Sequence, residues 1–120
     1  MKLRNPRPAG FTLVEIMIVV AIIGLLAAIA LPNFVRARTT SQKNACINNL
    51  REFDGAVQQY ALERKLPSAA TYALDDLKPY IKLKSTGDIT DCPAAGTYAA
   101  GAAISEAPTC SLFGIGHVFR

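Results

Sequence analysis

The sequence contains no tryptophan, a single histidine and few charged residues. Charged side chains make up 18% of its 120 residues, below the roughly 25% of an ordinary soluble domain. The shortage is concentrated, because the 21 residues from Phe11 to Leu31 carry one charge, that of Glu15. A run so poor in charge excludes a plain soluble globular protein. The length allows one small domain after the run and argues against two.

The apolar run has the length of a membrane span. As a helix, residues 11–31 extend roughly 31 Å at about 1.5 Å per residue, and the hydrocarbon layer of a bilayer is about 30 Å thick. A cleaved secretory signal is the alternative, but its apolar stretch is only about 7–15 residues long and ends at a small-residue cleavage site. The sequence Pro32-Asn33-Phe34 is not such a site. We therefore predict one transmembrane helix over residues 11–31.

The basic residues gather around the apolar run. The formal net charge is +4, but three of the 13 basic residues lie in the first ten positions, and the remainder carries 10 basic against 9 acidic residues. The high pI therefore indicates membrane orientation rather than contact with nucleic acid. Counting the free amino terminus, the basic groups favour a cytoplasmic N-terminus by a single charge.

Glu15 is the one charged residue inside the predicted span. A carboxylate costs about 2.5–3.5 kcal/mol at the centre of a membrane helix, and less near its end, where Glu15 lies. One interpretation is a tolerated acid at the headgroup level. The other is a carboxylate that awaits a positively charged partner.

Residues 10–34, GFTLVEIMIVVAIIGLLAAIALPNF, resemble the N-terminal segment of type IV prepilins and type II secretion pseudopilins. The resemblance implies that residues 1–10 are a leader, cut on the cytoplasmic side between Gly10 and Phe11 by a prepilin peptidase. The same enzyme would then N-methylate Phe11. Glu15 takes the acidic position of the family, fifth in the mature chain, where it serves subunit assembly.

Elementary physics agrees with that role of Glu15. The cut removes three basic side chains that hold the helix end in the membrane. It also creates an amine four residues, about 6 Å, from the carboxylate of Glu15. When subunits stack, Glu15 of one subunit can meet the Phe11 amine of its neighbour. Because a buried unpaired charge is costly, this pairing selects one register.

The resemblance also implies a fold and a function. The expected fold is α+β: a long kinked N-terminal helix, transmembrane in its first half, packed on a small antiparallel β domain. The expected function is that of a structural subunit of a type II secretion pseudopilus or type IV pilus, and not of an enzyme. Its expected partners are copies of itself, other pilin-like subunits, the prepilin peptidase, an inner-membrane assembly platform and lipid. It would be a single-pass protein of the bacterial inner membrane with a periplasmic C-terminal domain, assembled into a periplasmic or surface filament.

Two other functions compete with this one. A DNA-uptake pilin needs clustered basic residues on the outer domain, but the lysines there are interspersed with aspartates. A membrane-anchored enzyme needs a catalytic constellation, and His117 has no evident partner by motif. We therefore expect no nucleic-acid partner and no catalytic site.

The helix is expected to continue beyond the membrane over residues 32–65 as an amphipathic segment. Pro32 lacks a backbone donor and clashes with the preceding turn, so it should kink or locally unwind the helix. Apolar residues then recur at helical spacing and predict one buried stripe. They are Cys46, Leu50, Phe53, Val57 and Tyr60.

The outer domain is predicted over residues 66–120. Residues 73–80 indicate a short helical turn cut off at Pro79, with acidic residues near its start. Residues 96–104 and 114–119 are predicted as two strands, joined by a turn at residues 105–108.

Three cysteines cannot all pair within one chain. Cys92 and Cys110 flank the predicted hairpin, where the core is thinnest, so we predict a disulfide between them. It would contribute about 3 kcal/mol on the chain-entropy model. Cys46 on the apolar stripe is interpreted as a small buried hydrophobe, and its pairing with either of the others stays open.

No metal or cofactor is predicted. Cys92, Cys110 and His117 have the donor types of a zinc site, but they lack short ligand spacing and a fourth ligand. Asp88 and Asp91 are too few for calcium, which takes 6–8 oxygen ligands.

Overall fold

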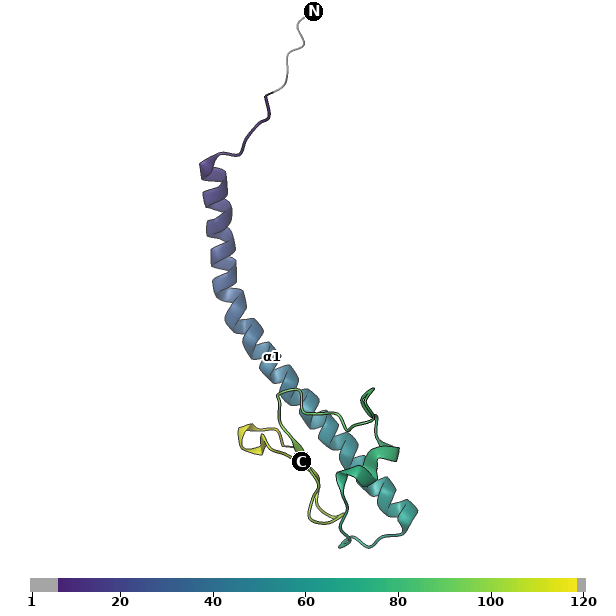
Figure 1. Ribbon diagram of the computed structural model, residues 1–120. Helices are drawn as coiled ribbons and strands as arrows, with labels where there is room; N and C mark the ends of the chain where they lie inside the picture. The colour runs from purple at the N-terminus through teal and green to yellow at the C-terminus, as the bar shows by residue number, and fades with distance from the viewer. Residues whose placement is uncertain (1–6, 119–120) are drawn as a thin grey trace, which may run out of the picture. The chain divides into compact units, whose positions relative to one another are not determined.

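The computed structural model describes residues 7–118, and Figure 1 traces their elements in chain order. One α-helix, α1 (Leu13–Arg64), is followed by the 3-10 helix η1 (Leu74–Tyr80), the strands β1 (Tyr98–Ala99) and β2 (Thr109–Cys110), and the 3-10 helix η2 (Phe113–Ile115). The described chain divides after Arg36 into two compact units. A long helix with a small antiparallel sheet is the α+β arrangement that the sequence predicts, so the fold class is confirmed.

The C-terminal half of α1 supplies the backbone of the core. Cys46, Leu50, Phe53 and Val57 are buried as the helical spacing predicts, and Tyr60 is half-buried. Ala56 and Ala61 are also buried, which widens the stripe. Such a face is stable only when other parts of the chain cover it.

A Schellman motif ends α1 at the predicted place. Lys65 adopts a left-handed backbone conformation, with φ of 52°. The amide of Leu66 then donates to the carbonyl of Ala61 at 2.9 Å, and that of Lys65 to the carbonyl of Leu62 at 3.3 Å. These two bonds satisfy carbonyls that the helix end would otherwise leave free.

Helix η1 packs on the stripe through its one fully buried side chain, Leu77. The carboxylate of Asp76 accepts a hydrogen bond from the amide of Ala73 at 2.9 Å, which caps the start of the helix. The predicted helical turn is confirmed, although the 3-10 helix runs through Pro79 to Tyr80 instead of stopping before it. The Tyr80 hydroxyl donates to Glu63 of α1 and fixes this end of η1 to the helix.

The sheet is shorter than predicted, and its second strand lies elsewhere. Tyr98 pairs with Cys110 and Ala99 with Thr109 in an antiparallel ladder. The prediction of a strand over residues 114–119 is wrong for the described part, residues 114–118, where η2 is followed by irregular chain. Gly116 has a positive φ of 91°, which breaks the extended backbone that a strand requires. Position 119 lies outside the described residues.

Strand β1 closes the core over α1. The rings of Tyr98 and Phe53 meet edge to face, with centroids 4.9 Å apart, a favoured geometry for aromatic pairs. The side-chain amide of Asn49 donates to the Tyr98 hydroxyl at 3.0 Å. The loop between the strands folds back tightly, because a Cβ on Gly101 would lie 2.3 Å from the carbonyl oxygen of Glu106.

Candidate functional site

The predicted processing and assembly residues lie just before α1 and in its first turn. Gly10 and Phe11 lie in irregular chain just before the helix, and both are exposed. A Cβ on Gly10 would meet no atom within 4 Å. The fold itself therefore does not require glycine at this position, and the peptide bond between Gly10 and Phe11 is accessible from solvent.

Glu15 forms a capping box with Thr12. The Glu15 carboxylate accepts hydrogen bonds from the Thr12 amide at 2.9 Å and from its hydroxyl at 3.1 Å. The Thr12 hydroxyl oxygen in turn accepts a hydrogen bond from the Glu15 amide at 3.2 Å. This reciprocal pattern satisfies amides that the first helical turn leaves free. The Thr-x-x-Glu spacing is a readable signal of it that the sequence analysis missed.

The first half of α1 exposes its apolar side chains on all sides. An 18-residue window of the helix has a mean hydropathy of 2.9, and no residue of that window is buried. By length and composition, α1 is the one helix of the described chain that could cross a membrane. A surface of this kind is stable in lipid or against other apolar helices, and not in water.

Pro32 lies inside α1, and the chain stays α-helical on both sides of it. The local unwinding that the sequence allowed is therefore not seen. The kink stays a prediction.

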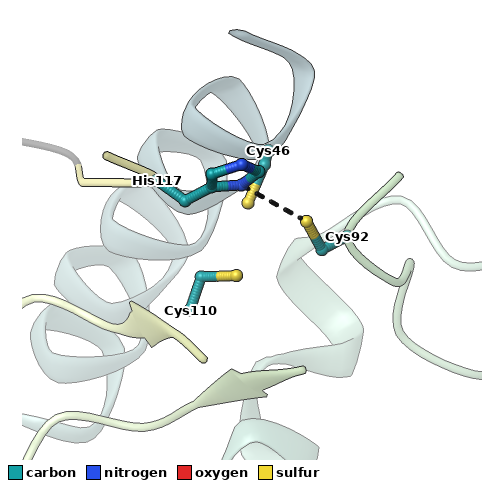
Figure 2. A group of neighbouring side chains, drawn as sticks. All are labelled: Cys46, Cys92, Cys110 and His117. Carbon is teal, nitrogen blue, oxygen red and sulfur yellow. Dashed lines mark hydrogen bonds between the residues drawn. The ribbon is translucent and has the colours of Figure 1, made fainter. Parts of the chain in front are cut away.

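Cys92 and Cys110, the predicted disulfide partners, belong to a larger group of buried side chains (Figure 2). Cys46 from α1 and His117 from the chain after η2 join them. All three cysteines are free thiols in the structure. The disulfide between Cys92 and Cys110 stays a prediction.

The surroundings of these thiols are unequal. Burial raises the pKa of the Cys46 thiol to about 12, against the opposing effect of the neighbouring Tyr98 hydroxyl. Burial also disfavours the Cys92 thiolate, but contacts with Cys46 and with the backbone amides of Ala94 and Gly96 outweigh it. Together they lower the pKa of Cys92 below its usual range.

From the sequence, Cys92, Cys110 and His117 were considered together as zinc donors and set aside for lack of short ligand spacing and a fourth ligand. A disulfide of Cys46 was left open, but Cys46 was not added to that donor set. Cys46 lies 46 positions before Cys92, and its spacing within α1 is explained by the apolar stripe alone. Neither Cys46 nor His117 carries a local pattern that indicates the group.

The start of the chain matches a known protein family. Residues 5–31 match the family described as the Prokaryotic N-terminal methylation motif. The match includes the exposed Gly10-Phe11 peptide bond, the capping box and the whole apolar run from Phe11 to Leu31.

Curated relatives come from both filament systems. The chain is 48% identical over 60 residues to the "Type IV major pilin protein PilA" of Myxococcus xanthus, a match that covers 50% of this chain and 27% of the relative. It is 42% identical over 78 residues to "Fimbrial protein Q" of Moraxella bovis, covering 65% and 49%. It is 35% identical over 57 residues to the "Type II secretion system core protein G" of Klebsiella pneumoniae, covering 48% and 41%.

The chain thus spans between about a quarter and a half of the length of these relatives. No solved structure matches it. The methylation motif, the long apolar start of α1 and relatives in both systems agree with one another. The start of the chain carries the prokaryotic N-terminal methylation motif, and the chain is similar to type IV pilins and to type II secretion core protein G.

Proposed function

We propose that this chain is a structural subunit of a type IV pilus or type II secretion pseudopilus that polymerises from the inner membrane through α1. The observation that carries the proposal is the uncovered apolar surface of α1. Eighteen consecutive residues of the helix are unburied at a mean hydropathy of 2.9. Lipid covers such a surface before assembly, and the α1 helices of neighbouring subunits cover it afterwards.

Processing prepares the helix end for this transfer. A prepilin peptidase cuts between Gly10 and Phe11 and methylates the new amine of Phe11. Both residues are exposed ahead of the helix, as a peptidase substrate must be. Removal of the leader takes away three basic side chains, which favour the membrane surface over a filament core.

Glu15 then sets the register of assembly. In the uncut chain its carboxylate is held by Thr12, so its position relative to the first turn is defined. The Phe11 amine of a neighbouring subunit neutralises it when the helix leaves the bilayer. A carboxylate without that partner is costly inside an apolar filament core.

The topology follows from the same proposal. The N-terminus faces the cytoplasm, and the unit after Arg36 faces the periplasm. An inner-membrane assembly platform extracts the subunit, and other pilin-like subunits share the filament.

The outer unit gives little support to a DNA-uptake role. Lys78 pairs with Asp75 at 3.0 Å, and Lys84 pairs with Asp91. Lysines neutralised by neighbouring aspartates do not form the basic surface that DNA phosphates require.

The test is deletion of the gene in its source bacterium, followed by assays of protein export, twitching motility and transformation. If the protein is a pseudopilus subunit, the deletion strain loses protein export. If it is a surface pilin, the strain loses twitching, and if it is a DNA-uptake pilin, the strain loses transformation. Complementation with the intact chain should restore the lost trait and return this protein to the sheared filament fraction. Complementation in a strain without prepilin peptidase is the matched control and should restore neither. Normal export, motility and filaments in the deletion strain would overturn the proposal.

A further inference from the structure

Four buried side chains from four separate segments converge on one point (Figure 2). Cys46 comes from α1, Cys92 from the loop after η1, Cys110 from β2 and His117 from the chain after η2. None of the four is more than 4% exposed. Their potential ligand atoms all lie within 4.8 Å of one another.

The distances are close to those of a tetrahedral metal site. Zinc binds cysteine sulfur at about 2.3 Å and histidine nitrogen at about 2.0–2.1 Å, which places neighbouring ligand atoms roughly 3.6–3.8 Å apart in a tetrahedron. Cys92 Sγ and His117 Nδ1 are already 3.6 Å apart. The remaining pairs need a contraction of about 1 Å at most. We propose that Cys46, Cys92, Cys110 and His117 bind one zinc ion.

The donor set and its burial define the kind of site. Three thiolates and one imidazole are a common ligand set of structural zinc, and they complete its four-coordinate shell. No position is left for water or substrate, so the site is structural and not catalytic. The fourth ligand is Cys46, the residue that the sequence assigned to the core stripe.

The sulfurs of Cys92 and Cys110 also contact the neighbouring loop at residues 94–96. The backbone amides of Ala94 and Gly96 contact the Cys92 sulfur, as the loop turns back with the Ala95 amide donating to the Cys92 carbonyl at 2.9 Å. A Cβ on Gly96 would lie 2.7 Å from Cys110 Sγ. Glycine is therefore required for this sulfur to lie against the loop. Such contacts orient metal ligands and stabilise thiolates.

A basic side chain lies close to the segment that carries His117. Binding of one Zn²⁺ to three thiols and a neutral histidine releases three protons and leaves one net negative charge. The Lys43 ammonium lies close to Gly116, since a Cβ on Gly116 would be 2.7 Å from Lys43 Nζ. Gly116 directly precedes the ligand His117, and Lys43 lies three residues before Cys46.

The zinc ion would connect three segments of the outer unit to α1. A disulfide between Cys92 and Cys110 connects only two of them and leaves Cys46 and His117 buried without a role. A small unit with a thin core gains most from such a crosslink. The zinc site does not depend on the proposed filament function.

The experiment uses the full chain extracted in detergent and purified without chelator. Its zinc content is measured by elemental mass spectrometry, and its thiols by alkylation and denaturing intact mass. We expect one zinc per chain and three thiols that alkylate only after a chelator removes the metal. Substitution with Co²⁺ should give the visible bands of a tetrahedral site and a sulfur-to-metal charge-transfer band.

Two variants separate ligand loss from damage to the core. Cys46→Ala removes a ligand and should lower the zinc content from one per chain to near zero, although it leaves Cys92 and Cys110 free to pair. Val57→Ala is the matched control, since Val57 is fully buried in α1 but is not a ligand. It should weaken the fold and keep the zinc.

Three results would overturn the zinc site. The first is a wild-type mass lower by two hydrogens with a Cys92–Cys110 crosslink in peptide maps. The second is a reduced protein that takes up neither zinc chloride nor Co²⁺ at equimolar concentration. The third is unchanged zinc content in Cys46→Ala.

Discussion

Two hydrogen-bonding groups of Thr12 hold the carboxylate of Glu15 within its own chain. The same carboxylate is the group that we propose to pair with the Phe11 amine of a neighbouring subunit. The two roles are compatible, because a carboxylate accepts several hydrogen bonds at once. They are also separable by substitution, because a capping box accepts glutamine as well as glutamate.

Glu15→Gln should keep the cap and lose the charge. We expect normal membrane insertion, or better insertion than wild type, because a charge is removed from an apolar span. Filament yield should fall several-fold, because the neighbouring amine has no counter-charge. Glu15→Ala should have the same effect and Glu15→Asp an intermediate one. The measurement is the sheared filament fraction against the membrane-bound level in the same cells.

Thr12→Ala is the matched control for Glu15. It removes the hydroxyl from the cap, at a cost of about 1 kcal/mol to the helix end, and keeps the carboxylate. Filament yield should stay much closer to wild type than in Glu15→Gln. Equal filament yields from Glu15→Gln and wild type would contradict the pairing role and favour the other interpretation, a tolerated acid at the headgroup level.

Gly10 should matter to the peptidase and not to the fold. A Cβ there meets nothing within 4 Å, so Gly10→Leu should leave the secondary structure of the chain unchanged. The bulky side chain should block the cut and keep the precursor in the membrane. Intact mass of the extracted wild type should give residues 11–120 plus one methyl group, and the variant should retain residues 1–10. A wild-type chain that keeps its leader in cells with active peptidase would contradict the processing scheme.

At the scale of elements, α1 carries two different surfaces in one continuous helix. Its first part is apolar on all sides and unburied, whereas its second part buries one stripe beneath the outer unit. The stripe and the strands meet at Phe53, which is 2% exposed and packs edge to face on Tyr98. Stability of the outer unit therefore depends on single side chains of α1.

Phe53→Ala should destabilise the outer unit by about 3–5 kcal/mol, because it removes a buried aromatic ring and leaves a cavity. Leu62→Ala, at a position of α1 that is 79% exposed, should change the free energy of unfolding by less than about 0.5 kcal/mol. Denaturant unfolding of the detergent-held chain, followed by near-ultraviolet circular dichroism of the tyrosines, measures both. Similar midpoints for the two variants would show that the stripe does not hold the domain.

The end of α1 is not optimised. Lys65 occupies a left-handed position, with φ of 52°, that glycine adopts without steric cost. Lys65→Gly should raise the free energy of unfolding by about 0.5–1 kcal/mol. Glycine removes the steric cost of the left-handed conformation, and its greater freedom in the unfolded chain offsets part of that gain. Lys65→Ala is the control, since it shortens the side chain but keeps the Cβ, and it should give no gain. Thermal unfolding of the two variants side by side checks this.

At the scale of the whole molecule, the proposed processing would change the charge balance. Without the first ten residues the chain carries 10 basic and 9 acidic side chains. Aspartates also pair with Lys78 and Lys84 in the outer unit. This balance leaves little excess positive charge for DNA phosphates, so we expect no nucleic-acid partner for the mature subunit.

The mature chain should therefore bind duplex DNA weakly, if at all, even at low salt. Fluorescence anisotropy with a labelled duplex, at low and at physiological ionic strength, measures this. The uncut Gly10→Leu precursor, which keeps its three leader cations, is the informative comparison and should bind more tightly at low salt. Salt-sensitive binding of the mature chain as tight as that of the precursor would favour the DNA-uptake function.

Local patterns determined much of this protein from sequence. The apolar helix over the first part of α1, the buried stripe from Cys46 to Tyr60 and the end of α1 at Arg64 were all predicted. A helix repeats every few residues, so its pattern lies within one segment. The proposed processing and assembly residues were named in the same way, since Gly10, Phe11 and Glu15 are close in the chain, and their roles stay predictions. The capping box at Thr12 was equally local and was overlooked.

Only the tertiary structure decided the sheet and the cysteine group. The strand partner of Tyr98 is Cys110, and the predicted strand from Gly114 onwards gives way to a 3-10 helix and a turn at Gly116. The pairing of strands depends on which distant segment covers the α1 stripe. Strands of two residues are also too short to show the alternating pattern from which a strand is predicted. For the same reason Cys46 was interpreted as a core residue, with its pairing to Cys92 or Cys110 left open. It meets Cys92, Cys110 and His117 because a loop, strand β2 and the segment after η2 fold back to the same place on α1, a convergence that no spacing in the sequence records.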